Sequence, residues 1–233
     1  MHARRSFLSR LGITAAAIGL GSAKAFAQSG TTKAPAESGG AKPSAESGSA
    51  KATAERSDIW QPARDTKDDW FDQIPGRHRL FFDTLTDTGL RDARGFANNY
   101  FDASKSGYGL EQGEVAVVIC LRHRATPFAF NDTFWAKYGP ALADSLKLAD
   151  PKIAANPHKT QLEALIKRGV HFAVCDMASH RFAGGIARKV DGDAEAIYKE
   201  MVATVVGNAH FVAAGIVAVN RAQERGYSIA YTG

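Results

Sequence analysis

One stretch of this 233-residue chain limits the possible folds more than any other, the run EVAVVICL at 114–121. A strand with one face in water alternates apolar and polar residues, whereas a strand covered on both faces is apolar throughout. The valine-rich composition of the run favours a strand over a buried helix segment. We therefore expect a central strand of a parallel sheet that has helices on both sides.

The rest of the chain alternates strand and helix patterns around this run. The alternation predicts a doubly wound α/β sheet of five strands, because right-handed crossovers place helices on both faces. We expect Pro140, Pro151 and Pro157 to break 139–157 into a long loop with a short helix inside it. The further strands are predicted at 79–83, 170–174, 211–214 and 227–231, and the helices at 87–104, 131–138, 160–168, 176–187, 193–205 and 216–225.

Residues 1–27 have the pattern of a cleaved signal peptide. Arg4 and Arg5 are followed by Phe-Leu, then by an apolar run at 11–20 and a small-x-small cleavage site ending at Ala27. Paired arginines in this setting are typical of twin-arginine signals, so the twin-arginine export machinery is the expected partner and the periplasm the expected location. The apolar run is shorter than the roughly 20 residues that span a bilayer, which predicts no stable membrane anchor after cleavage.

Two N-terminal segments precede the predicted domain. Residues 28–57 contain no large apolar side chain and repeat Ala-Glu-Ser-Gly at 36–39 and 45–48, which predicts a disordered linker. Residues 58–77 carry Trp60, Trp70 and Phe71 and read as an N-terminal arm that covers either its own domain or a neighbouring subunit. Residues 78–233 form the predicted α/β domain.

The charge of the chain argues against a nucleic-acid partner. The formal net charge is +5, and the predicted signal peptide holds four basic residues and no acidic one, so removing it lowers the charge by four to +1. Binding to phosphate backbones needs a clustered surplus of Lys and Arg.

Cys175 is the first candidate for chemistry, because it stands where the predicted strand at 170–174 gives way to a helix. Ligands of open α/β sheets collect at the carboxyl ends of the strands, and a thiol at a helix N-terminus has its anionic form stabilised. The alternative is a small apolar filler, since cysteine is often buried. Cys120 lies near the end of the preceding strand, and a Cys120–Cys175 disulfide would be compatible with an oxidising compartment.

The second candidate group is Arg122-His123-Arg124, directly after the valine-rich run, with His180 five residues after Cys175. The arginines could bind an anion and the imidazoles could exchange protons, unless the tripeptide is simply a solvated loop. Together with Met177, the histidines and Cys175 could hold a soft metal or a noncovalent haem if they converge. The sequence has no Cys-x-x-Cys motif and no glycine-rich dinucleotide fingerprint, so we predict neither structural zinc nor a dinucleotide site.

Three blocks together resemble the DsrE/DsrF-like (YchN-like) family: EVAVVICL, LEALIKRGVHFAVCDMA and FVAAGIVAVNRAQERGYSIAY. The resemblance covers roughly residues 80–231. It implies a flavodoxin-like three-layer α/β/α fold with a mostly parallel five-stranded sheet, assembled into trimers or hexamers. It also implies that a cysteine at the position of Cys175 carries persulfide sulfur in sulfur metabolism.

Three functional hypotheses follow from the sequence. The first is a periplasmic sulfur-handling or thiol-redox protein that uses Cys175, with a rim site completed by His123. The second is a binding module for a small ligand, metal or haem on the same rim. The third is a structural oligomeric protein without catalysis, and the sequence leaves open whether the protein is an enzyme.

Overall fold

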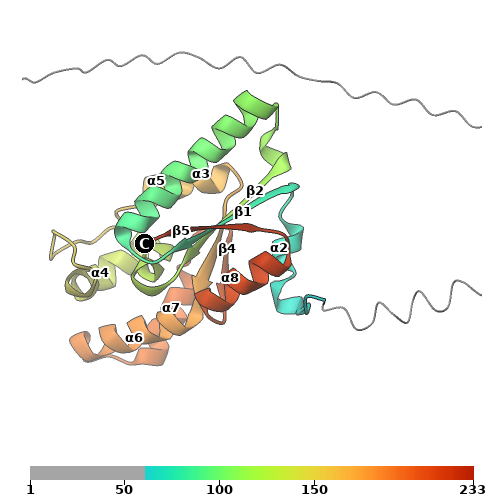
Figure 1. Cartoon of the computed structure of the whole chain (residues 1–233). Coiled ribbons are helices and arrows are strands. Elements are labelled where there is room, and N and C mark those ends of the chain that lie inside the picture. The colour runs from blue at the N-terminus through green and yellow to red at the C-terminus, as the bar shows by residue number, and fades with distance from the viewer. Residues whose placement is uncertain (1–60) are drawn as a thin grey trace, which may run out of the picture. The chain divides into compact units, whose positions relative to one another are not determined.

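The computed structural model describes residues 61–233. The expected signal peptide with Arg4 and Arg5, the linker at 28–57 and Trp60 lie outside the described residues. Figure 1 shows helices arranged around one twisted sheet, with α3 and α5 on one side and α8 on the other.

The elements follow the alternating order that the sequence predicts. The strands are β1 (His78–Thr84), β2 (Val115–Leu121), β3 (His171–Cys175), β4 (Ala209–Val212) and β5 (Ser228–Thr232). The helices are α2 (Trp70–Gln73), α3 (Asp87–Tyr108), α4 (Asp132–Leu146), α5 (Lys159–Lys167), α6 (Asp176–Val190), α7 (Ala194–Ala203) and α8 (Gly215–Glu224). Short 3-10 turns are η1 (Thr66–Asp68), η2 (Gln112–Glu114) and η3 (His123–Ala129).

The five strands form one parallel sheet in the order β4-β3-β2-β1-β5. The chain steps from β1 to β4 with its connecting helices packed in one core, then returns across the whole sheet through α8 to reach β5. This arrangement is a flavodoxin-like three-layer α/β/α fold, as expected, with every strand pair parallel. All seven residues of β2 are buried, in agreement with its unbroken apolar pattern.

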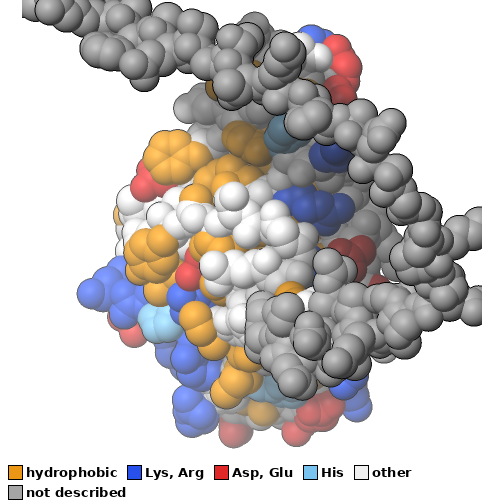
Figure 2. Space-filling model, turned by 45° about the vertical axis from the view of Figure 1, so that its right-hand side comes forward, with side chains coloured by type: hydrophobic (Ala, Val, Ile, Leu, Met, Phe, Trp, Pro, Cys, Tyr) orange, Lys and Arg blue, Asp and Glu red, His pale blue; other side chains and the backbone are white. Residues whose placement is uncertain are grey.

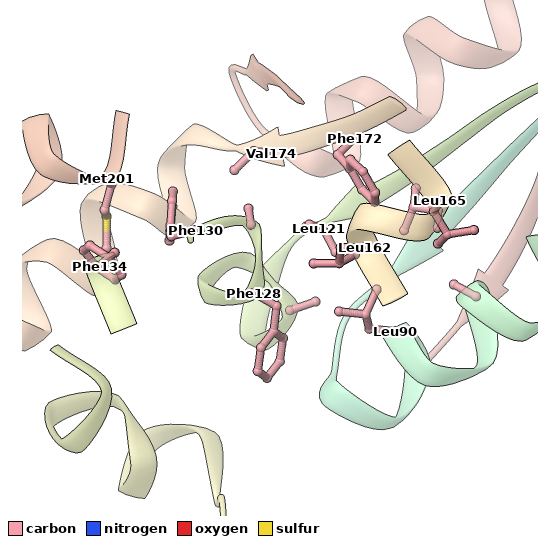
Figure 3. Packing of buried hydrophobic residues seen from close by; sticks show 14 of the residues in the cluster. Leu90, Leu121, Phe128, Phe130, Phe134, Leu162, Leu165, Phe172, Val174 and Met201 are labelled. Atoms are coloured by element: carbon pink, nitrogen blue, oxygen red, sulfur yellow. The ribbon is translucent and has the colours of Figure 1, made fainter. Parts of the chain in front are cut away.

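The larger core lies between the sheet and helices α3 to α7. Leu162 and Leu165 of α5 face Phe172 of β3 and Leu121 of β2 (Figure 3). Met201 of α7 lies beside Phe134 of α4 in the same view, so the α6–α7 pair belongs to this layer too.

The opposite face is covered by α8 and the N-terminal arm. Phe71 of α2 is fully buried there, and Trp70 stacks on Phe71 with ring centroids 3.8 Å apart. The Phe71 carbonyl accepts hydrogen bonds from Arg79 (2.8 Å) and from the Tyr227 hydroxyl (2.9 Å). The described part of the arm therefore packs on its own domain.

Several predicted boundaries differ from the structure: α3 continues to Tyr108 and α6 to Val190, past their predicted ends at 104 and 187. Helix α4 continues through Pro140 to Leu146, where the prolines predicted a loop. The buried side chains Trp135, Tyr138, Leu142 and Leu146 keep helical spacing across the proline, and their burial outweighs its cost of roughly 3 kcal/mol. Strand β4 begins two residues earlier than predicted, because its edge position leaves it only partly buried and weakens the apolar signal.

At the carboxyl edge of the sheet, the connections that follow two neighbouring strands run to opposite faces, and we call this place the switch point. The chain leaves β3 through α6 toward the larger core, whereas it leaves the neighbouring β4 through α8 on the opposite face. Ligand sites of doubly wound folds lie where adjacent strands diverge in this way. Within residues 61–233, no helix combines the length and apolar character that crossing a membrane requires.

Candidate functional site at the carboxyl edge of the sheet

Cys175 occupies the switch point. It is the last residue of β3 and the N-cap of α6, and no side chain caps that helix end. Its neighbour across the sheet is Val212, the last residue of β4. The thiol is free, and the residue is buried with 7% of its surface exposed.

The surroundings of Cys175 combine two helix starts with exposed apolar side chains. Helix α8 begins three residues after Val212, and Ala214 leaves its N-terminus without a side-chain cap. Met177 and Ile216, in the first turns of α6 and α8, are 69% and 61% exposed. The N–H groups of an uncapped first turn favour a negative charge nearby, so this edge of the sheet suits an anionic group.

Cys120 shares the same face of the sheet but lies deeper. It is fully buried in the cluster under α8, and its thiol donates to the Gly215 carbonyl at 3.9 Å. Burial, followed by the charge of Asp83 and the proximity of Cys175, raises the pKa of the Cys120 thiol well above its ordinary value. Cys120 therefore stays a neutral thiol.

The Cys120–Cys175 disulfide considered from the sequence is absent, and both cysteines are free. Cys120 pairs with Ala173, so Cys175 lies two residues further along the neighbouring strand. Strands about 4.8 Å apart with a two-residue offset place the Cα atoms on the order of 8 Å apart, beyond the roughly 7 Å that a disulfide spans.

Arg122 lies at the same edge of the sheet as Cys175. It directly follows Leu121, the last residue of β2, which pairs with Val174, the residue before Cys175. Its guanidinium forms a two-fold hydrogen bond with Asp83, with nitrogen–oxygen distances of 2.5 and 2.8 Å. The hydrogen bond to Asp83 raises the pKa of Arg122, so a permanent cation lies at this edge.

His123 and Arg124 belong to a cleft of their own, and the shared rim predicted for His123 and Cys175 is not seen there. His123 adopts a left-handed backbone with φ of 56°, which reverses the chain directly after Arg122. His123 and Arg124 line a cleft between α4 and α6 that Cys175 does not line. Side-chain direction after a strand depends on such a turn, which the sequence pattern does not encode.

His180 belongs to a third location, on the outer surface of α6 and α7. Its ring stacks on Tyr198 at 3.8 Å, and its Nε2 lies 3.7 Å from Asp176. The Tyr198 hydroxyl donates to Asp176 at 2.6 Å. Burial and then this hydrogen bond raise the pKa of Tyr198 to about 12. The Asp176 carboxylate is thus held toward α7.

The structure does not gather the residues considered for a soft metal or haem. Cys175, His123 and His180 lie in three separate environments, and Met177 is largely exposed. No cluster of three or more His, Cys, Asp or Glu side chains suited to a metal ion occurs within the described part of the chain. We propose no metal or haem site from these residues.

Two residues of the site were missed from the sequence. Asp83 is the partner of Arg122, and its place as a charged residue ending an apolar strand (RLFFD) was the available signal. Gly215 allows Arg122 to pack against the start of α8, because a Cβ there would lie 2.5 Å from the Arg122 side chain. Nothing in the sequence pattern marks that close approach.

In comparisons with known proteins, three chains of solved structures match this chain. No family model matches the chain. No curated protein matches it. Among solved structures, the chain is similar to "Structure of Protein of Unknown Function MTH1491 from Methanobacterium thermoautotrophicum", with 13% identity and a TM-score of 0.40. The match covers 66% of this chain and 98% of that one.

Proposed function

We propose that this protein is a DsrE/DsrF-like sulfur-handling protein that carries sulfane sulfur on Cys175. The observation that carries the proposal is the contrast between a free thiol at a strand end, on a residue that keeps 7% exposure, and a second free thiol on a fully buried residue. The resemblance of the three sequence blocks to that family supports it.

The proposed chemistry is transfer of one sulfur atom from a low-molecular-weight persulfide. The Cys175 thiolate attacks the outer sulfur of the donor R–S–SH, so that a new S–S bond forms on Cys175 and the donor S–S bond breaks. The bonding electrons leave with the donor as a thiolate, which takes up the proton lost by Cys175. The products are the Cys175 persulfide and R–SH, and no further oxidant or reductant is required.

Arg122 is the residue proposed to assist this transfer. A thiolate and a persulfide are both anions, and Arg122, which follows the strand next to that of Cys175, places a fixed positive charge at the same edge of the sheet. Asp83 neutralises part of that charge and holds the guanidinium in place. Arg122 is therefore a positioning and charge-stabilising residue in this proposal.

The test is sulfur loading followed by intact-mass measurement. We expect the wild-type protein to gain one reductant-labile sulfur after treatment with a low-molecular-weight persulfide, Cys175→Ser to gain none, and Cys120→Ser to behave as wild type. Loading that persists in Cys175→Ser, or wild-type protein that never loads, refutes the proposal. In the second case the binding or structural hypotheses take its place.

Assembly and export complete the proposal. We propose a homo-oligomer, trimer or hexamer, exported to the periplasm by the twin-arginine route. The exposed Met177, Ile216 and Tyr231 provide apolar surface for subunit contacts. Light scattering on the processed protein tests the assembly, and replacement of Arg4 and Arg5 by Lys, with retention of precursor in the cytoplasm as the expected result, tests the route.

A further inference from the structure

We propose that the cleft between α4 and α6 binds a small organic anion, at a site separate from Cys175 and beyond the proposed sulfur chemistry. The cleft has a volume of about 470 Å³, within the range of roughly 300–1,000 Å³ that small-molecule sites occupy. Its walls come from η3, α4 and α6.

The charge of the lining is strongly positive. Arg124, Arg181, Arg188 and Lys189 line the cleft together with one carboxylate, Asp144. Within residues 61–233, none of the three arginines has a carboxylate at ion-pair distance. Lys189 lies 3.9 Å from Asp144, whose side chain is 97% exposed. Unpaired arginines around a concavity are suited to an anionic group.

Helical spacing brings the α6 cations to one wall. Arg181, Gly185 and Arg188 follow the i, i+4, i+7 positions of one face, so the two arginines lie about 10 Å apart along the helix. Figure 2 shows Lys and Arg side chains gathered around a His at the lower left of that view, next to hydrophobic side chains.

Apolar side chains complete the cleft. Leu142, Phe182 and Ile186 line it, and the Arg181 guanidinium lies 5.7 Å from the centre of the Phe182 ring. A ligand with an apolar body and an anionic group would contact both kinds of surface. Inorganic anions alone would leave the apolar part of the cleft unused.

Gly185 keeps space free in the wall of the cleft. Glycine in a helix interior is unfavourable, yet α6 contains two in succession. A Cβ on Gly185 would meet only the end of the Arg188 side chain, at 3.9 Å, so the space above this residue is free. A larger side chain at position 185 would occupy the cleft without displacing backbone.

His123 is the neutral polar group of the site. Burial, followed by the charges of Arg181, Arg124 and Arg122, lowers the pKa of His123 below its ordinary value of 6.5. At neutral pH the imidazole therefore donates or accepts a hydrogen bond without adding charge.

The test uses the fluorescent anion 8-anilino-1-naphthalenesulfonate as the probe for the cleft. We expect Arg181→Glu to weaken its binding by about tenfold or more, because it reverses one of the cations. Gly185→Leu should abolish binding in the cleft without lowering the melting temperature. Lys199→Glu, an equal charge reversal on the exposed face of α7, is the control and should bind as wild type.

A neutral analogue of the probe separates anion recognition from simple apolar binding. N-phenyl-1-naphthylamine, which lacks the sulfonate, should bind the wild type about tenfold more weakly than the anion. Equal binding of the two probes, or binding of the anion that neither Arg181→Glu nor Gly185→Leu changes, overturns the inference. Cys175→Ser should bind the probe as wild type, so failure of the sulfur proposal and failure of this one are distinguishable.

Discussion

The two ends of the α8-covered face of the sheet are built from different kinds of contact. At the carboxyl end, Cys175, Arg122 and Asp83 lie beside an uncapped helix start and exposed apolar side chains. At the amino end, Trp70 stacks on His210 with ring centroids 4.0 Å apart, and the His210 Nε2 lies 3.0 Å from the His171 Nδ1. The first end offers groups to a ligand, whereas the second satisfies its groups internally.

The difference supports the proposal that chemistry takes place at the carboxyl end, whereas the amino end contributes stability. Strand ends in an open parallel sheet leave helix N–H groups free, and only the carboxyl ends are followed by helix starts. The arm closes the amino end through the Phe71 carbonyl and the buried Arg225, which donates to the Asp65 carbonyl at 3.1 Å. Changes at one end should therefore leave the other end intact.

The largest expected effect is the difference in reactivity between the two thiols. In the native protein a small alkylating reagent should modify Cys175 at least on the order of 100-fold faster than Cys120, since openings that expose a sealed thiol cost about 3 kcal/mol or more. Mass spectrometry of peptides after timed alkylation measures both rates. Similar alkylation rates for Cys175 and Cys120 would show that the two thiols are equally accessible and would contradict the account.

The next largest expected effect is a loss of stability when the packing of the arm at the amino end of the sheet is disrupted. Phe71→Ala should lower the free energy of unfolding by about 3–5 kcal/mol, because a fully buried ring is lost and a cavity remains. Phe96→Ala, at a ring that is 52% exposed, is the matched control and should cost less than about 1 kcal/mol. Urea denaturation measures both, and sulfur loading of Cys175 in folded Phe71→Ala should match the wild type. Impaired loading there would show that the two ends are not independent.

A smaller loss of stability is expected from the ion pair at the carboxyl end. Asp83→Asn leaves the mostly buried Arg122 without its counter-charge and should destabilise the fold by about 1–3 kcal/mol. Arg122→Met/Asp83→Asn should recover part of that loss, yet load sulfur more slowly than wild type because the cation is gone. Lys105→Met, which breaks an exposed ion pair with Glu111, should change stability by less than about 1 kcal/mol. If the double variant loads sulfur at the wild-type rate, Arg122 does not assist the proposed sulfur transfer.

The smallest effect concerns pH. Burial, followed by the proximity of His171, lowers the pKa of His210 to about 4 from 6.5. Between these two pH values the unfolded chain binds more protons than the folded one. The contribution of His210 to the free energy of unfolding is therefore complete above about pH 6.5 and is lost progressively as the pH falls toward 4. His210→Phe keeps a ring on Trp70 and should reduce the fall in melting temperature between pH 7 and 4.5. If the melting temperature of the variant falls as much as that of the wild type between pH 7 and 4.5, His210 does not contribute to the pH dependence of stability.

The sequence predicts the strands and the position of Cys175 well because both depend on local pattern. The continuous apolar run of β2 and the Gly169 that precedes β3 are local signals, and they place Cys175 at a strand end. The separation of His123 from Cys175 could not be predicted, since the direction of the chain after β2 depends on one left-handed residue. The spacing of Arg181 and Arg188 around the glycine pair was a usable signal for the cleft, but it becomes meaningful only when α4 is known to continue past Pro140.

The most direct measurement is site-resolved mapping of sulfur on the wild-type protein, where both thiols compete in the same molecule. After brief treatment with a low-molecular-weight persulfide and blocking of the remaining thiols, we predict that added sulfur is found on the peptide containing Cys175 and that Cys120 is unmodified. Sulfur on Cys120, or on neither peptide, would contradict the assignment of Cys175 as the sulfur-carrying thiol.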